Sequence, residues 1–524
     1  MRENLNTHFL LRLCMIWLYL ARNFVVGDKI YNRIDFPKDF IFGAGTSSYQ
    51  VEGATYEDGR KSSIFDTYAY SAGVSNGDVA AGGYYKYKED VQLMAETGLD
   101  AYRFSISWSR LIPDGRGPVN PKGLEYYNNL INELVKHGIQ PHVTLLHLDL
   151  PVALETKYKG FLNQSIIEDF TAYADVCFRE FGDRVKHWTT VNEANIFTMG
   201  GYDAGNSPPG RCSYPFGAIC TEGDSTTEPY IAAHNVLLAH ASAFNLYKNK
   251  YKGKQHGFVG FNLYAFDFIP YRNTTEDEKA VQRSYDFFIG WYMHPLVYGD
   301  YPETMKINAG SRIPTFTKNQ SGMVKGSFDF IGLNYYTIIL VVNSKLIDEP
   351  RNYYGDIASI WIYYNHSSPL EGSPFPVQPW GLQQVMEYFK KVYNNPPLYI
   401  QENGQVTSHA TNVNDPSRVE FLQAFIGALL DPLKNGSNVK GYFVWSFMDL
   451  YELTAGYEKS FGLYYVNFSD LNLGRYPKLS QKWYSGFLKG ADVSVNNEAN
   501  QVDDFSNVLR LSSAVEDDFR PLAL

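Results

Sequence analysis

The chain has 524 residues, of which 44% are hydrophobic and 19% are charged, a balance typical of a globular protein that can bury a large core. Its formal net charge is −10 and its pI is near 5.6. Nucleic-acid binding is disfavoured, because that function needs clustered Lys and Arg to neutralise phosphates. The aromatic share of 16% is high. Aromatic rings suit the faces of sugars, although tyrosine-rich surfaces are also common in secreted proteins.

The N-terminal segment predicts a secretory signal peptide over residues 1–27. Its apolar run, Phe9 to Leu20, follows Arg2 and is too short to span a membrane. Six Asn-x-Ser/Thr sequons fit passage through the secretory pathway: Asn163, Asn273, Asn319, Asn365, Asn435 and Asn467. We therefore expect a glycoprotein of the vacuole or the extracellular space (the apoplast), with no membrane attachment after signal removal.

The four cysteines predict one disulfide and no metal site. Cys212 and Cys220 lie in a Gly/Pro-rich loop, where a local disulfide is expected in an oxidising compartment. Cys177 falls in a helical pattern and is expected to be a buried thiol. No Cys/His cluster has metal-ligand spacing, so we expect neither a metal nor another cofactor.

Strand-like segments alternate with helical ones, which predicts a parallel sheet with crossover helices. Apolar residues recur at helical spacing in Gly123–His137, Ser165–Phe181 and Asp415–Leu433. The predicted strands are Phe40–Ala44, Ala101–Ile106, Gln140–Leu146, His187–Val191, Gly257–Asn262, Phe328–Leu333, Pro397–Ile400 and Val439–Trp445. Eight such units predict a single (β/α)8 TIM barrel over residues 28–490.

Two long insertions, Gly200–Glu228 and Val342–Pro379, are expected to form loops at the C-terminal face of the barrel strands. The polar, acidic tail 491–524 is expected to be disordered. No internal repeat or linker divides the chain.

Polar and aromatic residues follow nearly every predicted strand, where side chains of a barrel converge on one mouth. In chain order they are Gln50, Arg103, His147, Asn192, Glu193, Asn262, Asn334, Tyr336, Glu402, Trp445 and Glu452. Such a set can bind the hydroxyl groups of a neutral hexopyranose and place an aromatic floor beneath its ring. His147 alone could be a core histidine, and Arg103 alone a structural ion-pair partner. Their convergence at one end of the barrel favours a binding site.

Two carboxylates, Glu193 and Glu402, end β-rich runs in opposite halves of the chain. Cleavage of a glycosidic bond needs such a pair on facing walls of a pocket: one protonates the leaving oxygen, and the other attacks or stabilises the sugar carbon. We expect Arg103 to keep Glu402 ionised and aimed. An Asn-Glu pair often arises by chance, so the prediction depends on the whole set of residues.

From about Phe36 to Gly490 the chain resembles glycoside hydrolase family 1, and in particular its plant β-glucosidases. The resemblance is carried, in order, by Asp39–Gly43, Ser47–Gly53, Tyr102–Arg110, Thr189–Glu193, Asn206–Cys212, Gly332–Tyr336, Glu402–Gly404 and Trp445-Ser446. It implies a retaining double displacement, with Glu193 as acid/base and Glu402 as nucleophile, about 5 Å apart. It also implies sugar contacts from Gln50, His147, Asn192, Tyr336, Trp445 and Glu452, with Phe461 nearby and Asn262 toward the aglycone side.

The chain departs from the family pattern at three positions. The family usually has Trp where this chain has Leu148 and Leu453, and Thr is commoner at Gln401. A missing indole at Leu453 removes a sugar platform and a hydrogen-bond donor, so the preference for glucose stays open.

Three functions are considered. The first is hydrolysis of β-D-glucosides of plant secondary metabolites, with a small-molecule glucoside as the only expected partner. The second is a transglucosidase that moves glucose from an acyl-glucose or glucoside to a phenolic or flavonoid acceptor. The third, a sugar-binding protein without turnover, is disfavoured because both carboxylates are present. The sequence leaves the aglycone and the oligomeric state open.

Overall fold

The computed structural model describes residues 30–217, 220–363, 376–411, 413–453, 455–491 and 493–494. The expected signal peptide, almost all of the expected disordered tail and the sequon at Asn365 lie outside the described residues. A short strand pair joins β1 (Ile30–Tyr31) to β15 (Val493–Ser494), so described structure extends past the predicted boundary at residue 490. No helix in these ranges is long and apolar enough to cross a membrane.

Eight parallel strands close into a barrel, because β2 pairs with β11 and β6 pairs with β7. In order around the barrel they are β2 (Ile41–Gly45), β3 (Ala101–Ser105), β4 (Gln140–Leu146), β5 (His187–Val191), β6 (Phe258–Pro270), β7 (Phe330–Asn343), β9 (Leu398–Asn403) and β11 (Val439–Trp445). The predicted TIM barrel is confirmed. The bounds of β4, β5 and β11 are those expected from the sequence, because their apolar runs are bounded by clear polar residues.

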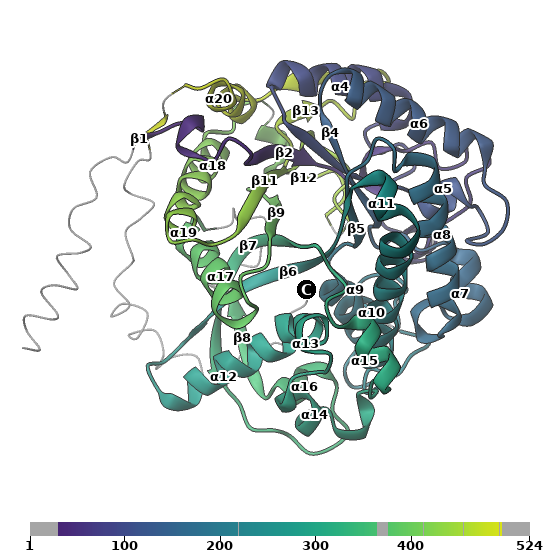
Figure 1. Cartoon of the computed structure of the whole chain (residues 1–524), viewed down its shortest axis with the longest axis vertical. Coiled ribbons are helices and arrows are strands. Elements are labelled where there is room, and N and C mark those ends of the chain that lie inside the picture. The colour runs from purple at the N-terminus through teal and green to yellow at the C-terminus, as the bar shows by residue number, and fades with distance from the viewer. Residues whose placement is uncertain are drawn as a thin grey trace, which may run out of the picture.

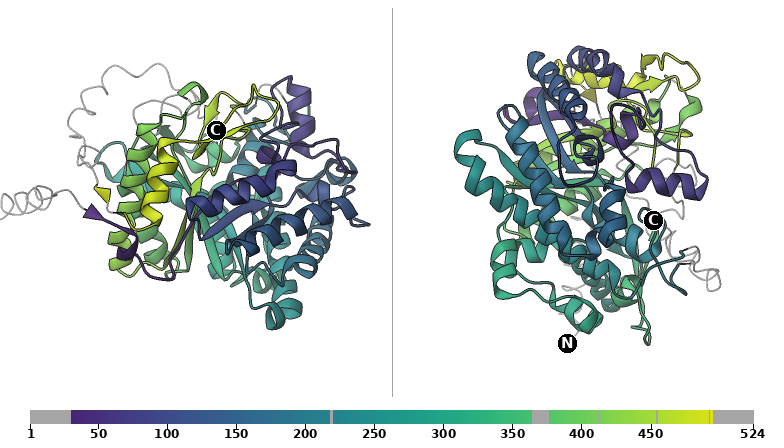
Figure 2. Two further views of the ribbon diagram at one scale, coloured as in Figure 1. Left: turned by 90° about the horizontal axis from the view of Figure 1, so that it is seen from above. Right: turned by 90° about the vertical axis from the view of Figure 1, so that its right-hand side faces the viewer.

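Helices surround the barrel (Figure 1). Those between successive strands are α4 (Gly83–Thr97), α6 (Pro121–Lys136), α8 (Ser165–Phe181), α10 (Glu228–Leu246), α12 (Thr275–Tyr285), α13 (Trp291–Tyr298), α17 (Pro379–Val392) and α18 (Pro416–Ala428). The C-terminal helix α20 (Leu479–Leu488), yellow in Figure 2, packs against α18 and α4. The first and last described segments therefore meet on one side of the barrel, where the first and last barrel strands pair.

Shorter helices fill the connections. They are α2 (Ser48–Val51), α3 (Ile64–Ala72), α5 (Trp108–Leu111), α7 (Val152–Tyr158), α9 (Ala194–Met199), α11 (Lys252–Gln255), α14 (Glu303–Ala309), α15 (Lys318–Val324), α16 (Tyr353–Ile357) and α19 (Leu430–Lys434). The predicted helix Asp415–Leu433 is divided into α18 and α19. Pro432 has no N–H to donate to the carbonyl of Ala428, and the Gln383 side chain donates to that carbonyl instead, at 2.9 Å.

The expectation that Val342–Pro379 forms a loop was wrong for part of this segment. It contains α16 and a further strand, β8 (Ser359–Tyr363), which pairs antiparallel with the extension of β7. β7 itself runs on to Asn343, ten residues beyond the end predicted at Leu333 (343 − 333). Both strands are rich in β-branched and aromatic residues, and pairing supplies partners for the backbone groups beyond the barrel rim.

The predicted disulfide is confirmed, since Cys212 and Cys220 are bonded with Cα atoms 5.3 Å apart. The Gly/Pro-rich segment that leads to Cys212 follows a π-helical turn, Gly200–Ala204. Cys177 is a buried free thiol in α8, as expected.

A buried ion pair links the first and second βα units. The Arg110 guanidinium donates to Glu52 at 2.8 Å, and the Tyr127 hydroxyl donates to the other carboxylate oxygen at 2.7 Å. Glu52 is 3% exposed and Arg110 is 1% exposed. Each charge therefore depends on the other for the interactions that water would otherwise supply.

Replacing Glu52 with Ala should lower the free energy of unfolding by roughly 3 kcal/mol or more, because the Arg110 charge would stay buried without a partner. The urea midpoint of unfolding measures the effect. The matched control is Asp114→Ala, which removes the exposed Lys61–Asp114 pair at 2.6 Å and should leave the midpoint almost unchanged. Equal midpoints for the two variants would contradict the prediction.

Candidate active site

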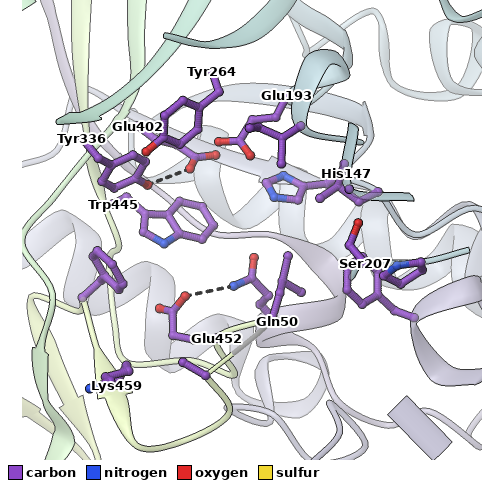
Figure 3. A pocket seen from close by; sticks show the side chains of 18 of the residues that line it. Gln50, His147, Glu193, Ser207, Tyr264, Tyr336, Glu402, Trp445, Glu452 and Lys459 are labelled. Carbon is purple, nitrogen blue, oxygen red and sulfur yellow. Dashed lines mark hydrogen bonds between the residues drawn. The ribbon is translucent and has the colours of Figure 1, made fainter. Parts of the chain in front are cut away.

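A pocket opens at the C-terminal ends of the barrel strands, with a cavity of about 280 Å³, near the lower end of the size range of small-molecule sites. Eight of the predicted site residues line it: Gln50, His147, Glu193, Tyr336, Glu402, Trp445, Glu452 and Phe461. Figure 3 shows Glu193 and Glu402 together at one end, Gln50 and Glu452 at the other, and the Trp445 indole between them. The predicted convergence on one mouth is therefore present for these residues.

Glu402 is held by two donors. Arg103 Nη1 lies 2.5 Å from Glu402 Oε1, and the Tyr336 hydroxyl donates to Oε2 at 2.9 Å. Burial raises the pKa of Glu402, and the Arg103 charge and the Tyr336 hydrogen bond oppose that shift. The predicted pairing of Arg103 with Glu402 is observed; it holds the carboxylate in one direction and favours its ionised form.

Glu193 has no such cation. Its side chain accepts one hydrogen bond, from Asn334 Nδ2 to Oε1 at 2.8 Å. Burial and the negative charge of Glu402 raise the pKa of Glu193 to about 8. Of the two buried carboxyl groups, Glu402 is thus the one stabilised as an anion and Glu193 the one that holds a proton.

The backbone also positions Glu193. It precedes α9 in the left-handed region, with φ 42° and ψ 54°, a conformation that costs free energy for a residue with a side chain. The Asn262 side-chain oxygen accepts the Glu193 N–H at 2.8 Å. This contact from β6 holds the strained turn, so the carboxylate emerges from the end of β5 at a fixed angle.

Three amides form a layer behind the carboxylates. Asn192 Oδ1 accepts hydrogen bonds from Arg103 at 2.6 Å and from Asn334 at 3.1 Å. Asn262 donates to Asn334 and to Gln401, both at 2.8 Å. The three asparagines are at most 1% exposed and are not among the residues that line the pocket. Asn262 was expected to approach the aglycone side. It does not line the pocket, because the oxygen and the nitrogen of its amide both bond groups inside the barrel.

Gln401 belongs to the same layer. Its amide nitrogen donates to Thr189 Oγ1 at 2.8 Å and its oxygen accepts from Asn262. A Cβ at Gly332 would lie 2.0 Å from Gln401 Oε1. The glutamine, longer than the commoner threonine, is therefore accommodated by the absent side chain of Gly332.

Two polar atoms along the pocket lack a hydrogen-bond partner among the described residues. Gln50 Nε2 donates to Glu452 Oε2 at 3.4 Å, but Glu452 Oε1 and His147 Nδ1 are buried and make no hydrogen bond to any described residue. The His147 ring stacks on Trp445, with centroids 5.8 Å apart. Burial lowers the pKa of His147 well below its usual value, so the ring is neutral and can donate or accept. Such orphaned atoms beside a cavity are suited to a polar ligand.

Sequence reasoning missed several lining residues. Tyr264 stacks on Tyr336, with centroids 5.6 Å apart. Strand alternation would have found it, because Tyr264 is two residues beyond Asn262 on β6. The rim also includes Phe65, Tyr68, Ile196, Ser207, Pro208, Val406 and Lys459. Most of these come from loops, whose paths a strand pattern does not determine.

Leu148 and Leu453 both line the cavity, at the two positions where indoles were expected. Within the ranges that the structure describes, no group of three or more His, Cys, Asp or Glu residues could hold a metal ion.

Comparison with known proteins places this geometry in a family. The family model for glycosyl hydrolase family 1 matches residues 32–492. The chain belongs to this family. Among curated family members, β-glucosidase 11 of Arabidopsis thaliana is 55% identical over 493 residues, covering 89% of this chain and 94% of that protein. A cyanidin 3-O-glucoside 5-O-glucosyltransferase (acyl-glucose) of Dianthus caryophyllus is also 55% identical, covering 91% of this chain and 93% of that protein.

Solved structures of the family agree with the fold. A mutant rice β-glucosidase, in a covalent complex with glucose, superposes with a TM-score of 0.84 at 43% identity, covering 87% of this chain and 99% of that one. A family 1 β-glucosidase from Thermotoga maritima gives a TM-score of 0.78 at 35% identity, covering 87% of this chain and 98% of that one.

Glu402→Gln should lower the pKa of Glu193, because it removes the negative charge that helps to keep the Glu193 proton bound. The protonated form of Glu193 should persist to about pH 8 in the wild type and be lost at lower pH in the variant. Difference infrared spectroscopy of the carboxyl band during a pH titration measures this. The control is Glu458→Gln, an exposed carboxylate, which should leave the titration unchanged. An unshifted band in Glu402→Gln would show that the two groups do not interact.

Proposed function

We propose that this protein is a retaining β-glucosidase that hydrolyses β-D-glucosides of plant metabolites through a covalent glucosyl-enzyme. One observation carries the proposal: at one end of a sugar-sized pocket, two carboxyl groups lie in unlike surroundings, Glu402 beside Arg103 at 2.5 Å and Glu193 in contact with no Lys or Arg of the described residues. Unlike pairs of this kind divide the roles of acid and nucleophile. Membership of glycosyl hydrolase family 1 supports the same assignment.

In the first step, Glu402 attacks the anomeric carbon and forms a C–O bond to it. The bond from that carbon to the aglycone oxygen breaks, and Glu193 gives this oxygen its proton, so the aglycone leaves as a neutral alcohol. Arg103 does not touch the sugar; it acts as a positioning residue that keeps Glu402 anionic and aimed.

In the second step, water attacks the same carbon, the Glu402 ester bond breaks, and Glu193 accepts the proton of the water. Once Glu402 is esterified its negative charge is gone, which removes one of the causes that raise the pKa of Glu193. The change favours the ionised form of Glu193 at the moment when a base is needed.

Binding of the sugar ring is assigned to the stretch of the pocket between the catalytic pair and Glu452. His147 Nδ1, near Glu193, and Glu452 Oε1, at the far end, are two buried lining atoms without a hydrogen-bond partner among the described residues, and Trp445 offers a flat apolar surface beside them. Hydroxyl groups both donate and accept, so a neutral Glu452 and a neutral His147 can each bind one. Asn192 and Asn334 were predicted as direct ligands. Asn334 contributes by donating to Glu193, and Asn192 by accepting from Arg103 and contacting His147.

A second candidate is transfer of glucose to an acceptor other than water. It is favoured by the glucosyltransferase relative and by the apolar rim, where Phe65, Tyr68, Leu148, Ile196 and Val406 could hold a flat ring. Incubation with a glucose ester and a flavonoid, followed by mass analysis of products, separates the two. Free glucose alone supports hydrolysis, and a new glucoside supports transfer.

Entry into the secretory pathway is also proposed. The sequons at Asn163, Asn273, Asn319 and Asn435 are exposed, and the Cys212–Cys220 disulfide suits an oxidising compartment. Removal of N-glycans from protein purified from its native tissue should lower its mass. An unchanged mass would count against this route.

Glu402→Gln should lower kcat for a 4-nitrophenyl β-glucoside by roughly 10⁴-fold or more, since no nucleophile remains. Glu193→Gln should lose the first step mainly on glucosides with poor leaving groups; with 2,4-dinitrophenyl glucoside, whose leaving group needs no proton, it should still release a burst of phenol before slow attack by water limits turnover. Azide should restore turnover of Glu193→Gln, because it attacks without a general base, and the product should be β-glucosyl azide. An α-azide, or rescue of Glu402→Gln to the β-azide, would reverse the assigned roles.

A further inference from the structure

One cation lines the pocket, and the proposed reaction does not use it. Lys459 lies in β12 (Lys459–Ser460), is half-buried, and lines the same cavity as Glu402 and Trp445. No other Lys or Arg is found among the described residues that line this cavity. In Figure 3, Lys459 lies beyond Glu452 as seen from the catalytic pair.

The direction of Lys459 follows from strand alternation. Its neighbour Ser460 is 1% exposed and faces the protein interior, where its hydroxyl donates to Asp449 at 2.6 Å and accepts from Lys478 at 2.5 Å. Phe461, on the other side of Ser460, lines the pocket. Lys459 therefore shares the pocket-facing side of this segment with Phe461.

The charge of Lys459 is not neutralised by the surrounding protein. Within the described ranges, no hydrogen bond or ion pair involves its ammonium group, and the nearby carboxyl groups have other partners. Asp449 is bound to Lys478 at 2.7 Å, and Glu452 is bound to Gln50. The flexible four-carbon stem of Lys459 leaves the ammonium free to move toward an anion in the cavity.

A sugar bound for the proposed reaction presents its far end to this region. With the anomeric carbon between Glu193 and Glu402 and the ring beside Trp445, the opposite end of the ring, which carries the 4-hydroxyl and the 6-hydroxymethyl group, would lie toward Glu452, the side chain at the end of the pocket away from the catalytic pair (Figure 3). Leu453 lines the wall next to Glu452. A leucine is smaller than an indole, so this end of the pocket has room for a substituent on the sugar.

We propose that Lys459 and Leu453 form a subsite for an acidic acyl group on the 6-hydroxyl of the glucose, such as a dicarboxylic acid half-ester whose free carboxylate pairs with Lys459. The inference deepens the proposed function and relies on it for the orientation of the sugar. The substrates would then be acylated, negatively charged β-glucosides as well as plain ones.

The other charged groups of the region do not oppose an anion there. Burial and the charges of Asp449 and Glu402 raise the pKa of Glu452 well above its ordinary value, which favours its neutral form and so weakens its repulsion of a carboxylate. Glu458 is exposed and, one residue before Lys459, faces the opposite side of the strand. Lys459 is thus the nearest full charge that a ligand would meet at this end.

Binding to the inactive Glu402→Gln protein tests the subsite without turnover. The probes are 4-nitrophenyl 6-O-malonyl-β-D-glucoside and its malonyl methyl ester, which differ by one negative charge, and calorimetry at pH 7 gives both dissociation constants. The acid should bind roughly fivefold more tightly than the ester. The preference should shrink in about 0.5 M salt, because a half-exposed ion pair is screened.

The second substitution assigns the preference to one residue. Glu402→Gln/Lys459→Met should bind acid and ester equally. The matched control is Glu402→Gln/Lys440→Met, since Lys440 is half-buried and lies at the opposite end of β11 from Trp445; it should keep the fivefold preference. Equal binding of acid and ester by Glu402→Gln, or a preference that survives Lys459→Met, would overturn the proposal.

The position of the acyl group is tested by Leu453→Trp in the same background. The added indole should weaken binding of both acylated probes by roughly fivefold or more relative to plain 4-nitrophenyl glucoside, because it fills their space. An equal effect on all three ligands would place the acyl group elsewhere. Wild-type hydrolysis of the plain glucoside is measured separately. Its absence would refute the proposed function, while the acid-over-ester binding preference alone decides the subsite.

Discussion

The contact between Arg103 and Glu402 joins two barrel strands that are separated by β2 and β11, and the site is organised around it. Arg103 comes from β3 and Glu402 from β9, and their side chains meet at 2.5 Å in a place where neither is more than 5% exposed. An arginine in such a place must be paired, because an isolated buried charge is strongly unfavourable. The second guanidinium nitrogen is taken by Asn192. The Arg103 guanidinium thus positions both the nucleophile Glu402 and Asn192, which belongs to the layer of amides.

The electrostatics of the two carboxyl groups follow from this single cation. Arg103 supports the anion on Glu402, and that anion in turn helps to keep the proton on Glu193. A symmetrical arrangement, with a cation for each carboxylate, would leave both ionised and provide no acid. The amide of Asn334 adds a neutral link, because it bonds Glu193 without offering it a charge. Acid and nucleophile therefore differ through their neighbours and not through their chemistry.

The sequence predicts well which residues lie at the strand ends around the site. It predicts poorly whether a given side chain faces the cavity or the layer beneath it. Glu193, Glu402, His147 and Trp445 follow apolar strands, and barrel closure brings the ends of those strands together whatever the loops do. Whether an amide faces the cavity or the layer beneath it depends on the register between strands, which one sequence pattern does not contain. Asn262 is the clearest case: it was expected near the aglycone and instead holds the backbone of Glu193. Lys459 lies on a two-residue strand too short to show a pattern.

The base of the pocket is constrained by hydrogen bonds, whereas its rim is constrained only by shape. This difference affects which substrates the protein can accept. At the base, Asn262 forms hydrogen bonds with both Gln401 and Asn334. A side chain at position 332, where the chain has glycine, would collide with Gln401. A change at any of these positions would leave a buried polar group unpaired, which costs more than the hydrogen bond itself contributes. At the rim, Leu148, Leu453 and Val406 contact the cavity without polar partners. Substitution at these rim positions alters the shape of the pocket but breaks no hydrogen-bond network. The chemistry of bond cleavage can therefore stay constant while the substituent on the sugar, or the acceptor that receives the sugar, changes.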